Sequence, residues 1–105
     1  MKTTMLSSAI ALATLGAFPA HAEDVAAGEA LYQSVCKNCH GPTAKGMASF
    51  PKLAGHSADY LSERLEQYRA GEKVGPNTAL MQPMATGLSD EDIAAPAAYI
   101  ATSFD

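Results

Sequence analysis

The sequence predicts an all-α protein with a single domain. Apolar residues recur at helical spacing in three stretches, and no stretch shows the strict apolar and polar alternation of a half-buried strand. Two segments rich in glycine and proline separate these stretches and are typical of loops. A chain of 105 residues has room for one domain at most.

The N-terminus predicts a secretory signal peptide over residues 1–22 that is removed by cleavage. Lys2 lies near the start, an apolar run from Leu6 to Ala20 follows, and Ala20-His21-Ala22 gives a small-x-small ending. An uncleaved anchor is the weaker alternative, because the apolar run is shorter than the roughly 20 residues of a membrane-spanning helix. We therefore expect an exported domain, residues 23–105, with no membrane span in the mature chain.

The mature chain is acidic. Loss of Lys2 with the leader changes the formal net charge from −4 to −5, and the remaining basic residues are scattered. Because binding to a phosphate backbone needs a basic stripe or patch, we expect no nucleic-acid partner. We expect instead a transient contact with a lysine-rich protein surface, with a reaction that slows as salt rises.

The first expected helix runs from Asp24, its expected N-cap, to about Asn38. Ala27, Leu31 and Val35 recur on one face of this helix at intervals of four residues. A cluster of two cysteines and a histidine lies at its C-terminal end. The sequence that follows, residues 41–55, is broken by glycine and proline and predicts a loop that wraps around another group.

A second helix is expected in the sequence SADYLSERLEQYRAG, with Ser57 as its cap and Gly71 at its end. Its apolar stripe consists of Tyr60 or Leu61, followed by Leu65 and Tyr68. The opposite face carries charged side chains that are expected to face water.

Residues 72–88 are expected to form a second loop, since Gly75-Pro76, Pro83 and Gly87 interrupt them. The last helix is expected to start at Ser89, which forms a capping-box-like pair with Asp92. Its apolar face is formed by residues at helical spacing, namely Ile93, Ala97, Ile100 and Phe104.

The cluster Cys36-Lys37-Asn38-Cys39-His40 carries the strongest functional signal. The pattern C-x-x-C-H is the signature of covalent haem attachment. Two thiols one helical turn apart point the same way, so each can add to one vinyl group of a haem. His40 then reaches over the porphyrin and binds the iron as the first axial ligand.

Two other interpretations of the cluster compete with haem attachment. A Cys36–Cys39 disulfide or redox pair is common in exported proteins, but a thioredoxin-like pair requires a βαβ context that the sequence lacks. A zinc site requires four ligands, and His40 stands too close to Cys39 for finger spacing. Covalent haem is also favoured because a domain of about 80 residues needs a staple for its small core.

A haem used for electron transfer needs a second axial ligand, for which Met47, His56, Met81 and Met84 are candidates. Met47 follows His40 by only seven residues and cannot easily reach the opposite face. His56 lies at a helix start, where a surface position is expected. Met81 and Met84 lie in the expected second loop, far enough along the chain to pass around the haem edge. The residues alone leave the choice between these two open.

The segments GEALYQSVCKNCHG, FPKLAG, DYLSERLEQYRAG and MQPMATGLSDEDIAAPAAYI resemble the class I c-type cytochromes of bacteria, especially the short periplasmic ones. The resemblance covers nearly the whole mature chain. It implies a class I cytochrome c fold, with three to four helices around one covalently bound haem c and with crossed first and last helices. It also implies a periplasmic location.

The resemblance further implies roles for individual residues. Gly28 matches the close-approach glycine of the first helix, and the Pro51 carbonyl would accept a hydrogen bond from the proximal imidazole. Met81 stands seven residues before Leu88, which is the family's spacing for the ligand methionine, so the resemblance favours Met81 over Met84. Pro96 departs from the family's usual leucine and is expected to kink the last helix at a cost of about 3 kcal/mol.

The expected function follows from the ligands. With Cys36 and Cys39 holding the haem and with His40 and Met81 on the iron, no coordination position is open to a substrate. We therefore expect a one-electron carrier and not an enzyme, with redox partners such as a respiratory complex, an oxidase or a dehydrogenase. The alternative is a haem c electron-accepting subunit of a larger dehydrogenase complex.

Overall fold

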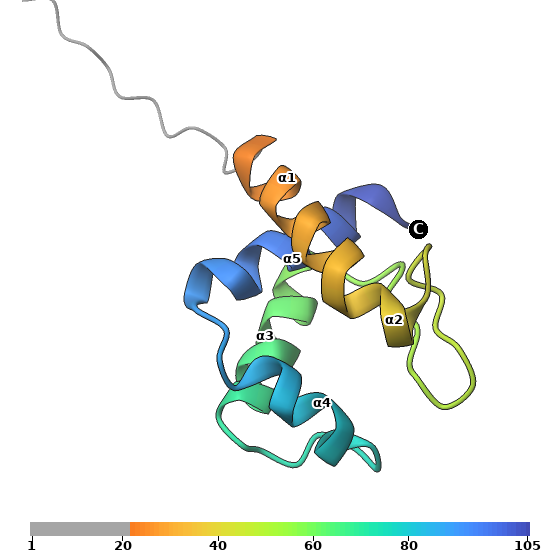
Figure 1. Cartoon of the computed structure of the whole chain (residues 1–105), viewed down its shortest axis with the longest axis vertical. Helices are drawn as coiled ribbons and strands as arrows, with labels where there is room; N and C mark the ends of the chain where they lie inside the picture. Colours follow the sequence, from red (N-terminus) through yellow and green to blue (C-terminus); the bar gives the residue numbers. More distant parts are fainter. Residues whose placement is uncertain (1–21) are drawn as a thin grey trace, which may run out of the picture.

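The computed structural model describes residues 22–105. These residues form helices joined by loops and contain no β-strand (Figure 1). The all-α prediction is confirmed. The predicted signal peptide lies outside the described residues, apart from Ala22 at the start of α1. The elements are α1 (Ala22–Leu31), a π-helical turn (Tyr32–Cys36), α2 (Lys37–His40), α3 (Ala58–Arg69), α4 (Thr78–Ala85) and α5 (Asp90–Ser103).

The first helix is longer than expected and changes its winding before the cysteine cluster. It begins at Ala22, so Asp24 lies inside the helix and is not its cap. The Lys37 amide donates to the Tyr32 carbonyl five residues earlier, which is the hydrogen-bond pattern of a π-helix. The extra residue in this turn changes the direction in which the α2 side chains point relative to those of α1.

The buried face of the first helix differs from the expected one. Gly28 and Tyr32 are buried, whereas Val35 is 40% exposed and Ala27 is also exposed. The stripe of Ala27, Leu31 and Val35 was therefore the wrong choice of core face. The reason is steric, because only the glycine side of the helix allows another backbone to approach closely.

The first and last helices cross at Gly28 (Figure 1). A Cβ atom at Gly28 would lie 2.0 Å from the Ala95 carbonyl oxygen and 2.8 Å from the Pro96 nitrogen. Pro96 is fully buried at this crossing, and α5 continues through it from Asp90 to Ser103. The missing Pro96 amide therefore does not prevent the terminal helices from packing.

Three aromatic rings fill the core beside the crossing. The Tyr32 ring centroid lies 5.7 Å from that of Tyr99 and 5.7 Å from that of Phe104, and the last two are 5.5 Å apart. The Tyr32 hydroxyl donates to the Gly41 carbonyl, directly after the cysteine cluster. Burial raises the pKa of Tyr32 to about 12, so the neutral, hydrogen-bonded phenol is retained well into the alkaline range.

The caps expected for α3 and α5 are present. The Ser57 hydroxyl accepts from the Tyr60 amide at 3.1 Å, and Ser89 and Asp92 form a reciprocal capping box. At the end of α3, the Gly71 amide donates to Tyr68 and the Glu72 amide donates to Gln67, with Gly71 at φ +80°. These two bonds form a Schellman motif, which stops the helix.

The prediction of a loop over residues 72–88 was wrong in its central part, which forms α4. The Thr78 hydroxyl organises the start of this helix, since it accepts from the amides of Val74 and Gly75 and donates to the Gly75 carbonyl. Pro83 removes only the bond to the residue four positions earlier, and α4 ends two residues later. A short helix tolerates proline near its end.

No helix among residues 22–105 combines the length and the apolar character needed to cross a bilayer.

Candidate haem site

The structure gathers Cys36, the last residue of the π turn, with Cys39 and His40 on the adjoining short helix α2. Both cysteines carry free thiols and are half-buried, whereas His40 is only 7% exposed. Their spacing of three residues places both thiols on the same side of the helix. Burial raises the pKa of the Cys36 thiol above its usual value, so this thiol is protonated at neutral pH. The arrangement suits thiol addition to two neighbouring vinyl groups.

The Pro51 carbonyl orients the imidazole of His40. His40 Nδ1 lies 2.8 Å from the Pro51 oxygen, and a carbonyl can only accept, so Nδ1 carries the proton. The other ring nitrogen, Nε2, then has its lone pair available for a metal. The residues present thus fit an iron held by His40.

The loop of residues 41–55 fixes the position of Pro51 through close backbone contacts. The Gly46 amide donates to the His40 carbonyl at 2.8 Å, and Gly46 has φ +82°. A Cβ atom at Gly46 would lie 2.5 Å from the Phe50 carbonyl oxygen and 3.0 Å from the Pro51 carbonyl carbon. The Leu53 and Ala54 amides both donate to the carbonyl of buried Ala44. The loop therefore closes on itself and returns Pro51 to His40.

The four candidates for the second ligand occupy different places. Met47 is 46% exposed, and its Cγ lies 3.7 Å from the Cβ position of Gly41, next to His40. His56 is exposed and stacks on Tyr60 with ring centroids 4.2 Å apart. Met81 and Met84 lie on α4, which is a separate element from α2 (Figure 1). Met81 is half-buried, whereas Met84 is 55% exposed.

Two sets of polar contacts hold the start of α4, and one of them reaches the loop after His40. The Asn77 side chain donates to the Ser49 carbonyl at 3.1 Å, which links the segment before Met81 to the loop after His40. Thr78, only 9% exposed, holds the turn before α4. The first contact was not predictable from the sequence, since it joins residues 28 positions apart. A threonine just before a run of good helix formers could have indicated the second.

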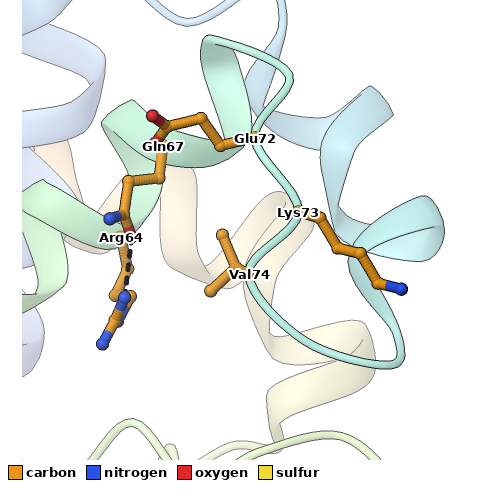
Figure 2. A pocket seen from close by; sticks show the side chains of 5 residues that line it. All are labelled: Arg64, Gln67, Glu72, Lys73 and Val74. Atoms are coloured by element: carbon orange, nitrogen blue, oxygen red, sulfur yellow. Dashed lines mark hydrogen bonds between the residues drawn. The ribbon is translucent and has the colours of Figure 1, made fainter.

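A polar hollow of about 420 Å³ lies between α3 and the segment that leads to α4 (Figure 2). Figure 2 shows Arg64 and Val74 extending on the same side and Lys73 pointing away from them. The Arg64 guanidinium donates to Gln67 at 2.7 Å and lies 5.0 Å from the Tyr60 ring centroid. None of the cysteine-cluster residues lines this hollow. The candidate site is therefore defined by the two cysteines and His40, and not by this hollow.

A small helical fold with C-x-x-C-H on one turn and a carbonyl-oriented histidine defines the class of c-type haem proteins. The family model described as Cytochrome c matches residues 25–104. The chain belongs to this family, whose members are electron carriers, and its cofactor is covalent haem c. Cys36, Cys39 and His40 have the spacing that this cofactor requires.

Curated relatives support this assignment. The chain is 52% identical to cytochrome c-554(548) of Halomonas halodenitrificans over 79 residues, which are 74% of this chain and 94% of the relative. It is 40% identical to cytochrome c-554(547) of Halothiobacillus neapolitanus over 89 residues, 77% of this chain and 98% of the relative. A thiosulfate dehydrogenase electron acceptor of Stutzerimonas stutzeri is 46% identical over 62% of this chain and 30% of its own length.

A solved structure shows the same fold. Reduced cytochrome c4 from Pseudomonas stutzeri superimposes with a TM-score of 0.71 at 31% identity, covering 79% of this chain and 49% of that chain. The class I cytochrome c fold expected from the resemblance is thus confirmed. The chain spans about half of this longer protein.

Proposed function

We propose that the protein is a periplasmic one-electron carrier in which Cys36 and Cys39 hold haem c and His40 and Met81 ligate its iron. The haem supplies a one-electron iron couple, and the polypeptide sets its environment. The observation that carries the proposal is the His40–Pro51 hydrogen bond of 2.8 Å beside the cysteine pair. It supports a proximal ligand that is already oriented within the polypeptide.

Each protein group has a defined task. Cys36 at the end of the π turn and Cys39 on α2 would hold the haem through thioether bonds. The Pro51 carbonyl holds the Nδ1 proton of His40, which raises the basicity of the ligating nitrogen. The soft thioether of Met81 stabilises the reduced iron and raises the reduction potential. Two protein ligands leave no position for a substrate, which favours a carrier over an enzyme.

Met81 is favoured over Met84 by its half-buried position on α4 and by its spacing of seven residues from Leu88. Met84 is largely exposed. A side chain that is already packed loses less conformational entropy when it binds a metal than one that projects into solvent.

The partners are proposed to be redox proteins such as a respiratory complex, an oxidase or a dehydrogenase. A second candidate function, an electron-accepting component of a larger dehydrogenase complex, is favoured by the relative described as a thiosulfate dehydrogenase electron acceptor. Stable co-purification with such an enzyme at physiological salt supports the second function. A monomeric or self-associated cytochrome that exchanges electrons only transiently supports the first.

Expression with a periplasmic cytochrome assembly system tests the proposal. The purified chain is expected to be coloured, to exceed the mass of the cleaved polypeptide by one haem, and to keep this haem after denaturation. A potentiometric titration is expected to follow a single one-electron Nernst curve. The Cys36→Ala, Cys39→Ala double variant is the matched control and is expected to lose the haem on denaturation. Colourless wild-type protein of bare polypeptide mass would contradict the proposal.

A further inference from the structure

The segment that carries Met81 is closed at its base by a single arginine. We define the α4 segment as residues 70–88, from the C-cap of α3 to the residue before the N-cap of α5. Arg69 directly precedes it, and its Nη1 donates to the Leu88 carbonyl at 3.2 Å. The same Nη1 lies 2.8 Å from Asp90 Oδ1. One guanidinium thus joins the two ends of the segment.

We call the contacts of Arg69 with Leu88 and Asp90 the clasp. The charges of Arg69 and Asp90 lie where the helix dipoles favour them. Arg69 occupies the last turn of α3, where a cation is stabilised, and Asp90 occupies the first turn of α5, where an anion is stabilised. The Asp90 side chain is 86% exposed and that of Arg69 is 30% exposed. An exposed ion pair contributes little to overall stability. Its position at the base of one segment gives it a local effect.

Apolar packing contributes little to holding the α4 segment. Within α4, Thr78 and Ala85 are the buried residues, and Leu80 is 57% exposed. The other apolar side chains of the segment are at most half-buried, and polar contacts such as Asn77 to Ser49 and the close approach of Gln82 to Gly71 add to them. A segment with few buried apolar contacts belongs to the parts of a protein that open first. The contacts of Arg69 at the base of the segment therefore contribute strongly to keeping it closed.

We propose that Arg69 is a positioning residue for the axial ligand: by joining Leu88 and Asp90 it keeps the α4 segment closed and limits the dissociation of Met81 from the iron. The inference rests on the proposed function, because it takes Met81 as the ligand. Arg69 itself touches neither the haem nor Met81 in this account. Without the clasp, the segment would open at its base more often, and the thioether would be released more often.

Competition by imidazole in the ferric holoprotein tests this role. Imidazole takes the second axial position only when the thioether has left, and its binding removes the thioether-to-iron charge-transfer band. The apparent affinity for imidazole thus reports the fraction of open segment. Arg69→Leu removes both contacts and is expected to raise this affinity about fivefold. Asp90→Asn leaves the Leu88 contact intact and is expected to raise it about twofold.

The chain offers matched controls. Glu91→Gln removes the same charge from the same turn of α5 without touching Arg69, and its imidazole affinity is expected to equal that of the wild type. Arg69→Lys restores a cation at the base and is expected to lie between Arg69→Leu and the wild type. Amide hydrogen exchange provides a second measurement, with faster exchange at Thr86 and Leu88 expected in Arg69→Leu.

Equal imidazole affinities in Arg69→Leu, Asp90→Asn and Glu91→Gln would overturn the role of Arg69 and leave the proposed function intact. If Arg69→Leu does not mature, the comparison of Asp90→Asn with Glu91→Gln decides in the same way. A wild-type ferric protein without the thioether band would overturn methionine ligation in the proposed function, and the inference with it. These failures are therefore distinguishable.

Discussion

Two regions of the molecule are stabilised by different kinds of contact. One is the crossing of α1 and α5, and the other is the α4 segment. At the crossing, backbone touches backbone at Gly28, and the rings of Tyr32, Tyr99 and Phe104 pack behind it. In the α4 segment, hydrogen bonds and one ion pair hold a short helix with exposed apolar side chains. The first region contains the fully buried side chains of Tyr32 and Pro96, and the second carries the proposed distal ligand.

This difference suggests how a small cytochrome can combine rigidity with ligand control. Cys36, Cys39 and His40 lie directly before Gly41, whose carbonyl accepts a hydrogen bond from the Tyr32 hydroxyl. This bond joins the cysteine cluster to the crossing. Met81 lies on the α4 segment, which is joined to the rest of the molecule by Arg69 at its ends and by the Asn77 side chain, which donates to the Ser49 carbonyl. Changes at the crossing should therefore alter global stability, whereas changes in the α4 segment should also alter ligand release.

The largest expected effect is that of Gly28→Ala. Its Cβ would overlap the Ala95 carbonyl oxygen, so the helices must separate, and we expect a loss of about 3 kcal/mol in the free energy of unfolding. Gly87→Ala in the α4 segment is the control, because its Cβ meets nothing within 4 Å, and it should change stability by less than about 0.5 kcal/mol. Denaturant titration of both holoproteins measures the contrast. Similar stabilities for the two variants would refute the close contact at the crossing.

An intermediate effect is expected from alkaline pH acting on Tyr32. Its pKa is raised from 10.0 to about 12 in the folded protein, so its stabilising effect is complete below pH 10 and is lost as pH rises toward 12. We expect a loss of about 2 kcal/mol in this window, since one pKa unit corresponds to about 1.4 kcal/mol. Tyr32→Phe should lack this component of the pH dependence. Parallel stability curves for the variant and the wild type would contradict the assignment to Tyr32.

The smallest effects compare a hydroxyl at the start of α5, just outside the α4 segment, with a hydroxyl inside that segment. Ser89→Ala removes the cap of α5, and Thr78→Val leaves the Val74 and Gly75 amides without their acceptor. Each change should lower the free energy of unfolding by about 1 kcal/mol. Only Thr78→Val should also raise the apparent affinity of the ferric protein for imidazole, by about fivefold. An equal rise in Ser89→Ala would show that loss of the α5 cap releases the α4 segment as readily as loss of the Thr78 contacts.

The parts of the fold that were predictable from the sequence carry local signals. Ser57, Ser89 and Asp92 mark helix starts through their own side chains, and each forms the expected bond. The cysteine cluster is also a local pattern, and the haem c that it predicts agrees with the family assignment. Local chemistry of this kind does not depend on how the elements pack.

The parts that were not predictable depend on contacts between distant residues. Periodicity assigned the core face of the first expected helix to Ala27, Leu31 and Val35, whereas packing against Ala95 selects Gly28. Only the family resemblance had indicated the close approach at Gly28. The α4 helix was not predicted, because glycines and prolines lie on both sides of it and within it. The Thr78 hydroxyl accepts from the amides of the preceding turn and so allows a helix to start there. The charged face of α3 was expected to face water, yet Arg69 joins Leu88 to Asp90.

The most direct test of the account is the thioether-to-iron charge-transfer band of the ferric holoprotein in Met81→Leu and Met84→Leu. Both substitutions keep an apolar side chain of similar size on α4, so the helix should be retained. We expect the band to vanish in Met81→Leu and to persist in Met84→Leu. A band that survives in Met81→Leu would contradict Met81 as the axial ligand, and its loss in Met84→Leu alone would assign that role to Met84.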